Sequence, residues 1–164
     1  MRIIGIDPGS RLTGYGLIDS DGMQSLCLTH GVIRLNGEAL PPRLGEIFAA
    51  ISGLIEEHRP DVMAIEQVFV AKNPSSALKL GQARGAAICA AVHGGLSVAE
   101  YTPTLIKKAV VGSGRADKKQ VQHMVQMILG LGKKPQSDAA DALAVALSHA
   151  HTHTTLMHRS GHGK

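Results

Sequence analysis

The sequence is poor in aromatic side chains, with no tryptophan, two phenylalanines and two tyrosines among its 164 residues. Its core must therefore be built from aliphatic and small side chains, which the 19 glycines allow to pack closely. No stretch approaches the ~20 consecutive apolar residues of a membrane-spanning helix, so we expect no membrane partner. Asp7 interrupts the first apolar segment, where a signal peptide needs an unbroken one.

Cysteine is also scarce, since Cys27 and Cys89 are the only two and lie far apart in apolar surroundings. They provide neither a disulfide framework nor a zinc-ligand spacing, which predicts a reducing, cytoplasmic compartment. With 44% hydrophobic and 18% charged residues, the chain is neither disordered nor fibrous. Its length is typical of one domain, which we place at residues 1–151, followed by a disordered tail at residues 152–164.

Positive charge is concentrated in one part of the chain. The whole chain has 17 Lys and Arg against 13 Asp and Glu, a net charge of +4. Residues 101–135 hold seven cations and one acid, a net charge of +6, which leaves −2 for the remainder. The cations of this basic segment are Lys107, Lys108, Arg115, Lys118, Lys119, Lys133 and Lys134. Such a segment can bind a polyanion, although an ordinary solvated surface is an equal alternative.

Apolar runs and turn residues predict an α/β protein with a five-stranded mixed sheet flanked by helices. The expected strands are residues 2–7, 13–20, 23–35, 62–66 and 96–101. The expected helices are residues 41–58, 77–93, 104–110, 118–129 and 137–150. Strands separated by helices favour parallel pairing, whereas the opening hairpin adds an antiparallel portion.

Four acidic residues occupy positions where a site can form. Asp7 and Glu66 each end an apolar strand, and ligands bind at the carboxyl ends of parallel strands. Asp138 and Asp141 lie three residues apart near a helix start, so they share one helix face. Each has a simpler explanation: an Asx turn for Asp7, the first exposed residue after a strand for Glu66, and a favourable helix dipole for the α-helical pair.

Taken together, the four acids predict a metal site. Four ionised carboxylates would carry a charge of −4, which two divalent ions would offset. Without cations, mutual repulsion would raise the pKa values of the carboxyl groups. Oxygen ligands without Cys or His suit Mg²⁺, for which Mn²⁺ can substitute. Two such ions about 3.5–4 Å apart promote in-line displacement at phosphorus. Beside a basic segment, they indicate a metal-dependent nuclease.

These residues lie in motifs that resemble the RuvC family, the bacterial Holliday junction resolvases of the ribonuclease H-like superfamily. The resemblance covers nearly the full chain, from residue 3 to about residue 151. Its motifs, in order, are GIDPGSRLTGYG (5–16), IEQVF (65–69), SALKLGQARG (76–85), VQHMV (121–125) and DAADALA (138–144). In this order and over this length they are highly specific, although Asp-x-Gly alone would be weak.

The resemblance implies a fold, an activity and partners. It implies a ribonuclease H-like fold and a homodimer that binds a four-way DNA junction and nicks two strands of like polarity, in recombination and repair. It also implies two Mg²⁺ ions per subunit, and work alongside the branch-migration proteins RuvA and RuvB in the bacterial cytoplasm. The family's catalytic and metal-binding acids match Asp7, Glu66, Asp138 and Asp141. Its basic residues that face DNA near the metals match Lys107 and Lys118.

Further candidate DNA contacts lie in the loop after Glu66 and in the basic segment. Phe69 either tucks under its loop or stacks on a base that is unpaired at the junction, and the family resemblance supports stacking. Cations would contact phosphates and make affinity depend on salt, without reading sequence. The cations expected to do so are Lys72, Lys107, Lys108, Arg115, Lys118, Lys119, Lys133 and Lys134.

Small residues recur every four positions in the helix expected at residues 77–93, at Gly81, Gly85 and Cys89. Such a strip lets another backbone approach closely, either the chain's own sheet or the second subunit of a two-fold dimer.

Three other functions remain open at this point. An actin-like ATPase has a phosphate-binding hairpin that resembles Ile6–Gly14. Such an ATPase needs two domains of this kind, and 164 residues supply one. In a non-catalytic nucleic-acid module, Asp138 and Asp141 would only complement the helix dipole. A related nuclease for RNA precursors is disfavoured by that acidic pair and by the Phe69 loop.

Overall fold

The predicted helices and strands are present, in the predicted order, in the computed structural model. It describes residues 1–68 and 73–160, the last seven as backbone only. Within these ranges the strands are β1 (Arg2–Asp7), β2 (Leu12–Ser20), β3 (Ser25–Arg34), β4 (Val62–Glu66) and β5 (Ser97–Tyr101). The helices are α1 (Leu40–His58), α2 (Pro74–His93), α3 (Pro103–Val111), α4 (Lys118–Ile128) and α5 (Ser137–Ser160). None of these helices in the described residues combines the length and apolar character needed to cross a bilayer.

In the described part of the chain, the five strands form one mixed sheet in the order β3-β2-β1-β4-β5. The β1–β2 and β2–β3 pairs are antiparallel, whereas β1–β4 and β4–β5 are parallel. The mixed sheet predicted from the sequence is therefore confirmed. Because β1 and β4 are parallel neighbours, their carboxyl ends lie side by side at one edge of the sheet.

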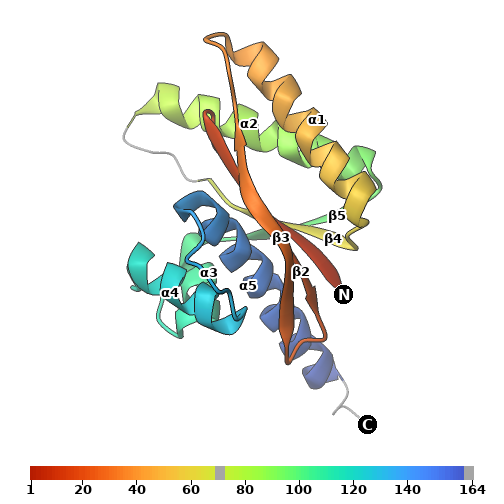
Figure 1. Ribbon diagram of the computed structural model, residues 1–164, viewed down its shortest axis with the longest axis vertical. Helices are drawn as coiled ribbons and strands as arrows, with labels where there is room; N and C mark the ends of the chain where they lie inside the picture. Colours follow the sequence, from red (N-terminus) through yellow and green to blue (C-terminus); the bar gives the residue numbers. More distant parts are fainter. Residues whose placement is uncertain (69–72, 161–164) are drawn as a thin grey trace.

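Helices cover both faces of the sheet (Figure 1). Alternate residues of β1 point to opposite faces, so Ile4 packs under α1 and α2 while Ile3 packs under α3, α4 and α5. The fully buried residues of both cores are aliphatic, alanine or methionine, and Phe48 packs only at a margin. The scarcity of aromatic residues thus corresponds to an aliphatic core, as expected from the composition.

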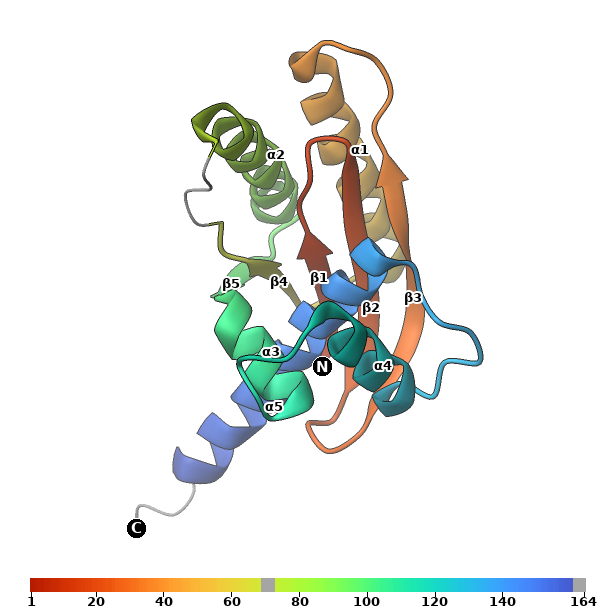
Figure 2. The same cartoon turned by 90° about the vertical axis from the view of Figure 1, so that its left-hand side faces the viewer.

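Helix α5 lies unusually close to β1 and β2, which it crosses (Figure 2). A Cβ atom built on Gly5 would overlap the carbonyl oxygen of Ala142, and one on Gly14 would overlap that of Asp138. Glycine is required at both positions because only a strand without side chains there admits the helix backbone. This close approach sets the distance between the start of α5 and the ends of the neighbouring strands.

Two helix boundaries differ from the sequence-based prediction by more than one residue. Helix α2 begins about one turn early, at Pro74, because the Asn73 side chain accepts hydrogen bonds from the Ser75 and Ser76 amides at 3.0 and 3.4 Å. Helix α5 continues to Ser160, so residues 152–160 are helical where a disordered tail was predicted. The alternating His and Thr residues there include neither Gly nor Pro, the residues that most strongly end helices.

Candidate active site

The backbone brings the four predicted acids to one edge of the sheet. Asp7 is the last residue of β1, and Glu66 is the last residue of β4. Ile6 pairs with Ile65, so continuing this register places Asp7 beside Glu66. Asp138 and Asp141 lie in the first two turns of α5, next to the same strand ends. The strand ends and the start of α5 are thus adjacent, and Asp7, Glu66 and Asp141 line one cavity to which Asp138 does not contribute.

A cavity of about 290 Å³ opens between these elements. Asp7, Glu66 and Asp141 contribute carboxylates to its lining, and Lys107 from α3 and Lys118 from α4 contribute cations. Its remaining walls are apolar, from Pro103, Ile106, Val121, Ala144 and Val145. A pocket with apolar walls and few convergent charged groups is the usual form of a functional site.

Burial and mutual repulsion raise the pKa values of the two acids at the strand ends, Asp7 and Glu66. The pKa of Asp7 is raised to about 8, mainly by burial and in part by the charges of Asp141, Glu66 and Asp138, while the charge of Lys118 opposes the rise. Burial also raises the pKa of Glu66, with a further contribution from Asp141. Carboxyls in this situation bind either protons or cations, and such clusters are typical of functional sites.

Lys118 is the cation most closely joined to the acids. Its ammonium donates a hydrogen bond to Asp141 at 2.9 Å, and this bond raises the pKa of Lys118. Lys118 is the first residue of α4, whose start is fixed by reciprocal hydrogen bonds between Asp117 and Gln120. This cap holds Lys118 beside the cavity that it lines.

The donor set fits hard divalent cations. The converging groups are carboxylates, whose oxygens such ions prefer, and a divalent ion would offset the mutual repulsion that raises the pKa of Asp7. Within residues 1–68 and 73–160, no three His, Cys, Asp or Glu side chains stand close enough together to hold one ion. Part of that separation has a physical cause, because like charges repel and Asp141 is hydrogen-bonded to Lys118.

The other predicted DNA contacts divide into three groups. Lys107 is half-buried and lines the cavity, as does the more exposed Lys118. Lys108, Arg115 and Lys119 are exposed and lie beyond its lining, on or next to α3 and α4. Lys133 and Lys134 are exposed between α4 and α5. Phe69 and Lys72 fall outside the described residues.

Sequence reasoning missed two residues that brace the turn after Asp7. The buried Thr13 hydroxyl donates to the Gly9 carbonyl at 3.0 Å and accepts from the Gly9 amide at 3.3 Å. From α1, the buried Arg43 donates to the Ser10 carbonyl at 2.7 Å. The only sign of this in the sequence is that Arg43 stands within the apolar pattern of its helix, and that position does not identify the Ser10 carbonyl as its partner.

The sheet order and the position of α5 define the class of protein: the fold is that of the ribonuclease H-like superfamily. A family model described as "Crossover junction endodeoxyribonuclease RuvC" matches residues 3–149. The chain therefore belongs to the RuvC family. The RuvC protein of Pseudoalteromonas atlantica is 61% identical over 162 residues, which cover 99% of this chain and 94% of that protein. That of Photobacterium profundum is 60% identical, covering 97% and 92%.

Solved structures agree with this assignment. The structure of T. thermophilus RuvC in complex with a Holliday junction substrate has 34% sequence identity and a TM-score of 0.86, covering 94% of this chain and 96% of that one. The yeast mitochondrial resolvase Ydc2 is 15% identical with a TM-score of 0.71, covering 97% of this chain and 81% of the other, and shows the fold alone.

Proposed function

We propose that this chain resolves four-way DNA junctions by paired, symmetric nicks, through phosphodiester hydrolysis assisted by two Mg²⁺ ions. The observation that carries the proposal is the cavity in which Asp7, Glu66 and Asp141 converge and the pKa of Asp7 is raised to about 8. Family membership supports the junction as substrate, because the similar T. thermophilus structure holds a Holliday junction.

The chain's own residues would divide the work of cleavage. Asp7, Glu66, Asp138 and Asp141 would hold the two ions at the strand ends, and Mn²⁺ can replace Mg²⁺ in such an oxygen site. When bound, the ions supply activation of water and stabilisation of the leaving oxygen. Lys118 holds a protonated ammonium beside Asp141, where it would stabilise charge that develops on the phosphate.

DNA binding would rest on the cations around the cavity. Lys107 and Lys118 would contact the phosphate next to the bond that is cut, while the exposed Lys108, Arg115 and Lys119 extend the positive surface over α3 and α4. Such contacts position DNA and weaken as salt rises. We also expect Lys72 to contact phosphate and Phe69 to stack on an unpaired junction base, which contributes about 1–3 kcal/mol.

A two-fold dimer would match the two-fold symmetry of the junction, with one cavity for each nick. Support comes from α2, where Cβ atoms built on Gly81 and Gly85 meet nothing in the described part of the chain within 4 Å. On the same helix Leu78 and Cys89 are exposed. This open strip is suited to a second copy of the chain. Work alongside RuvA and RuvB, which move the branch point, belongs to the same proposal.

A nicking assay tests the proposed function directly. A labelled four-way junction and a linear duplex of the same sequence would be incubated with the protein, in Mg²⁺ and in chelator. We expect paired nicks in the junction with Mg²⁺ alone, and the Asp141→Asn variant serves as the matched control without cleavage. Equal cutting of the duplex, or cutting in chelator, would contradict the proposal.

A further inference from the structure

The last residue of β4 has a backbone carbonyl that β1 cannot satisfy. The Gln67 amide donates to the Tyr101 carbonyl at 2.8 Å, so Gln67 faces β5. Successive residues of a strand face alternate neighbours, so the Glu66 carbonyl faces β1. Continuing the register in which Ile6 pairs with Ile65, the amide due opposite this carbonyl belongs to Pro8. Proline has no N–H to donate.

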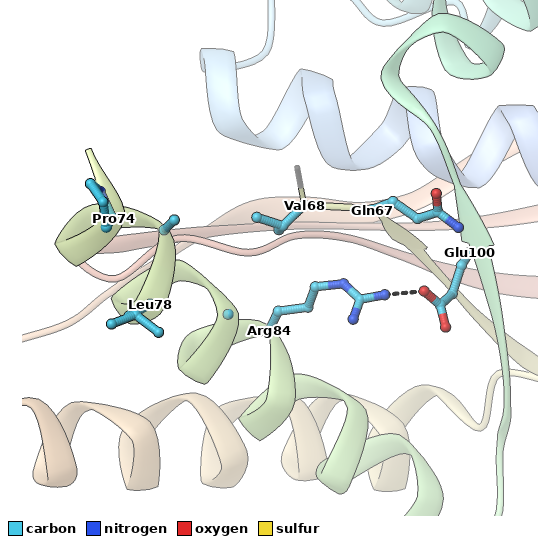
Figure 3. A pocket seen from close by; sticks show the side chains of 8 residues that line it. Gln67, Val68, Pro74, Leu78, Arg84 and Glu100 are labelled. Carbon is cyan, nitrogen blue, oxygen red and sulfur yellow. Dashed lines mark hydrogen bonds and ion pairs between the residues drawn. The ribbon is translucent and has the colours of Figure 1, made fainter. Parts of the chain in front are cut away.

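Arg84 of α2 supplies the missing donor. Its Nε–H donates to the Glu66 carbonyl at 3.1 Å, and its guanidinium also pairs with the carboxylate of Glu100 on β5. Figure 3 shows the Arg84 side chain extending from α2 toward Glu100, alongside Gln67. The Arg84 side chain is 18% exposed and that of Glu100 is 46% exposed, so the hydrogen bond to the Glu66 carbonyl is the better shielded of the two contacts. The planar guanidinium is thus fixed at two points, which a flexible ammonium could not match.

We propose that Arg84 is a positioning residue for Glu66, because it supplies the hydrogen bond to the end of β4 that Pro8 cannot. The peptide between Glu66 and Gln67 is held on one side by Arg84 and on the other by Tyr101. Without Arg84, that peptide can rotate, and the rotation changes the backbone angle ψ of Glu66. The carboxylate then leaves its place beside Asp7. This inference rests on the proposed function, which assigns Glu66 to cleavage.

The first test separates chemistry from binding. Single-turnover cleavage of a junction already bound to protein would be compared between the parent chain and Arg84→Gln, with Lys79→Gln as control. Lys79 is an exposed cation on the same helix, so the control makes the same change of charge. We expect Arg84→Gln to slow cleavage about 10- to 100-fold, as loss of a group that supports a ligand usually does. Junction affinity should stay within about twofold, and Arg84→Lys should recover part of the rate.

The second test needs neither DNA nor metal. In the free protein, hydrogen exchange at the Gln67 amide should become about tenfold faster in Arg84→Gln, while that at Ala64 in the middle of β4 stays unchanged. Replacing Pro8 with Ala restores a backbone N–H opposite Glu66. The loss caused by Arg84→Gln should therefore be smaller in a Pro8→Ala background than in the parent chain.

Three results would overturn the positioning role. They are cleavage by Arg84→Gln at the rate of Lys79→Gln, faster exchange throughout β4 instead of at Gln67, and strictly additive effects of the Pro8 and Arg84 changes. A parent chain that fails to cleave junctions would reject the proposed function, while the exchange experiment would still decide whether Arg84 holds the end of β4.

Discussion

On one face of the sheet, α5 rests on glycine backbone, and a Cβ atom on Gly5 or Gly14 would overlap its carbonyl oxygens. On the other face, α2 carries Gly81 and Gly85, whose Cβ positions meet no described atom within 4 Å. Leu78 on the same helix is 70% exposed. Small residues therefore serve two purposes here. In the strands they let the backbone of α5 approach the sheet, which brings the acids together. In α2 they leave a surface that no other part of the described chain covers.

Among changes on the two faces of the sheet, replacing the acids that lie beside α5 should have the largest effect. Asp7→Asn and Asp141→Asn should each reduce junction cleavage more than about 100-fold, since residues that merely support metal ligands already cost about 10- to 100-fold. Junction binding should persist because it depends on the cations. Cleavage rates and gel-shift affinities measure the two effects separately. Full activity in Asp141→Asn would remove that residue from the site.

Filling a glycine under α5 should be the largest disturbance of the fold. In Gly14→Ala, the added methyl group meets the carbonyl oxygen of Asp138, so either α5 or β2 must move. We expect a loss of about 1–3 kcal/mol in the free energy of unfolding, measured in urea, together with impaired cleavage. Gly45→Ala on α1 is the matched control, because no described atom lies within 4 Å of its Cβ position.

The pH dependence of stability offers a subtler comparison of the same acids. Because the pKa of Asp7 rises from 3.8 to about 8, the folded protein keeps a proton there that the unfolded chain releases between these pH values. Stability in metal-free buffer should therefore fall as pH rises through this range. Asp7→Asn should melt at a higher temperature than the parent chain near pH 8, and the difference should shrink toward pH 4. If the difference in melting temperature were the same at pH 4 and pH 8, the pKa of Asp7 would not be raised in the folded protein.

The smallest effect on the fold is expected on α2. Gly85→Leu should change the free energy of unfolding of the isolated subunit by no more than about 0.5 kcal/mol, since the site is open. It should nevertheless weaken dimerisation and uncouple the paired nicks, so singly nicked junctions accumulate. Sedimentation and the nicking assay measure these outcomes. A parent chain that is monomeric at micromolar concentration yet makes paired nicks would refute the dimer.

The sequence predicted the sheet, the helices and the acidic cluster because each depends on local patterns. Asp7 and Glu66 could be located since each ends an apolar run. The start of α2 was misplaced because Asn73 caps it from within a polar segment. The end of α5 was misplaced because a run of His and Thr was interpreted as a solvated tail.

Arg43 and Arg84 could not be assigned from the sequence. Each bonds to a backbone carbonyl, 33 residues away for Arg43 and 18 for Arg84. Any residue type can offer a carbonyl, so the partner leaves no mark in the sequence. Only the fold shows that both arginines reach from α1 and α2 through to the edge of the sheet where the acids lie.

The position of α5 late in the chain also sets when the nuclease is completed during synthesis. Until residues 137–160 leave the ribosome, the nascent chain lacks Asp138 and Asp141, and Ile3, Ile18 and Ala64 are not covered by α5. Such an exposed apolar face is a target for chaperones and proteases. Under the proposed function an interrupted chain could not cut DNA, because the ability to cut arises only once translation has passed through the helix.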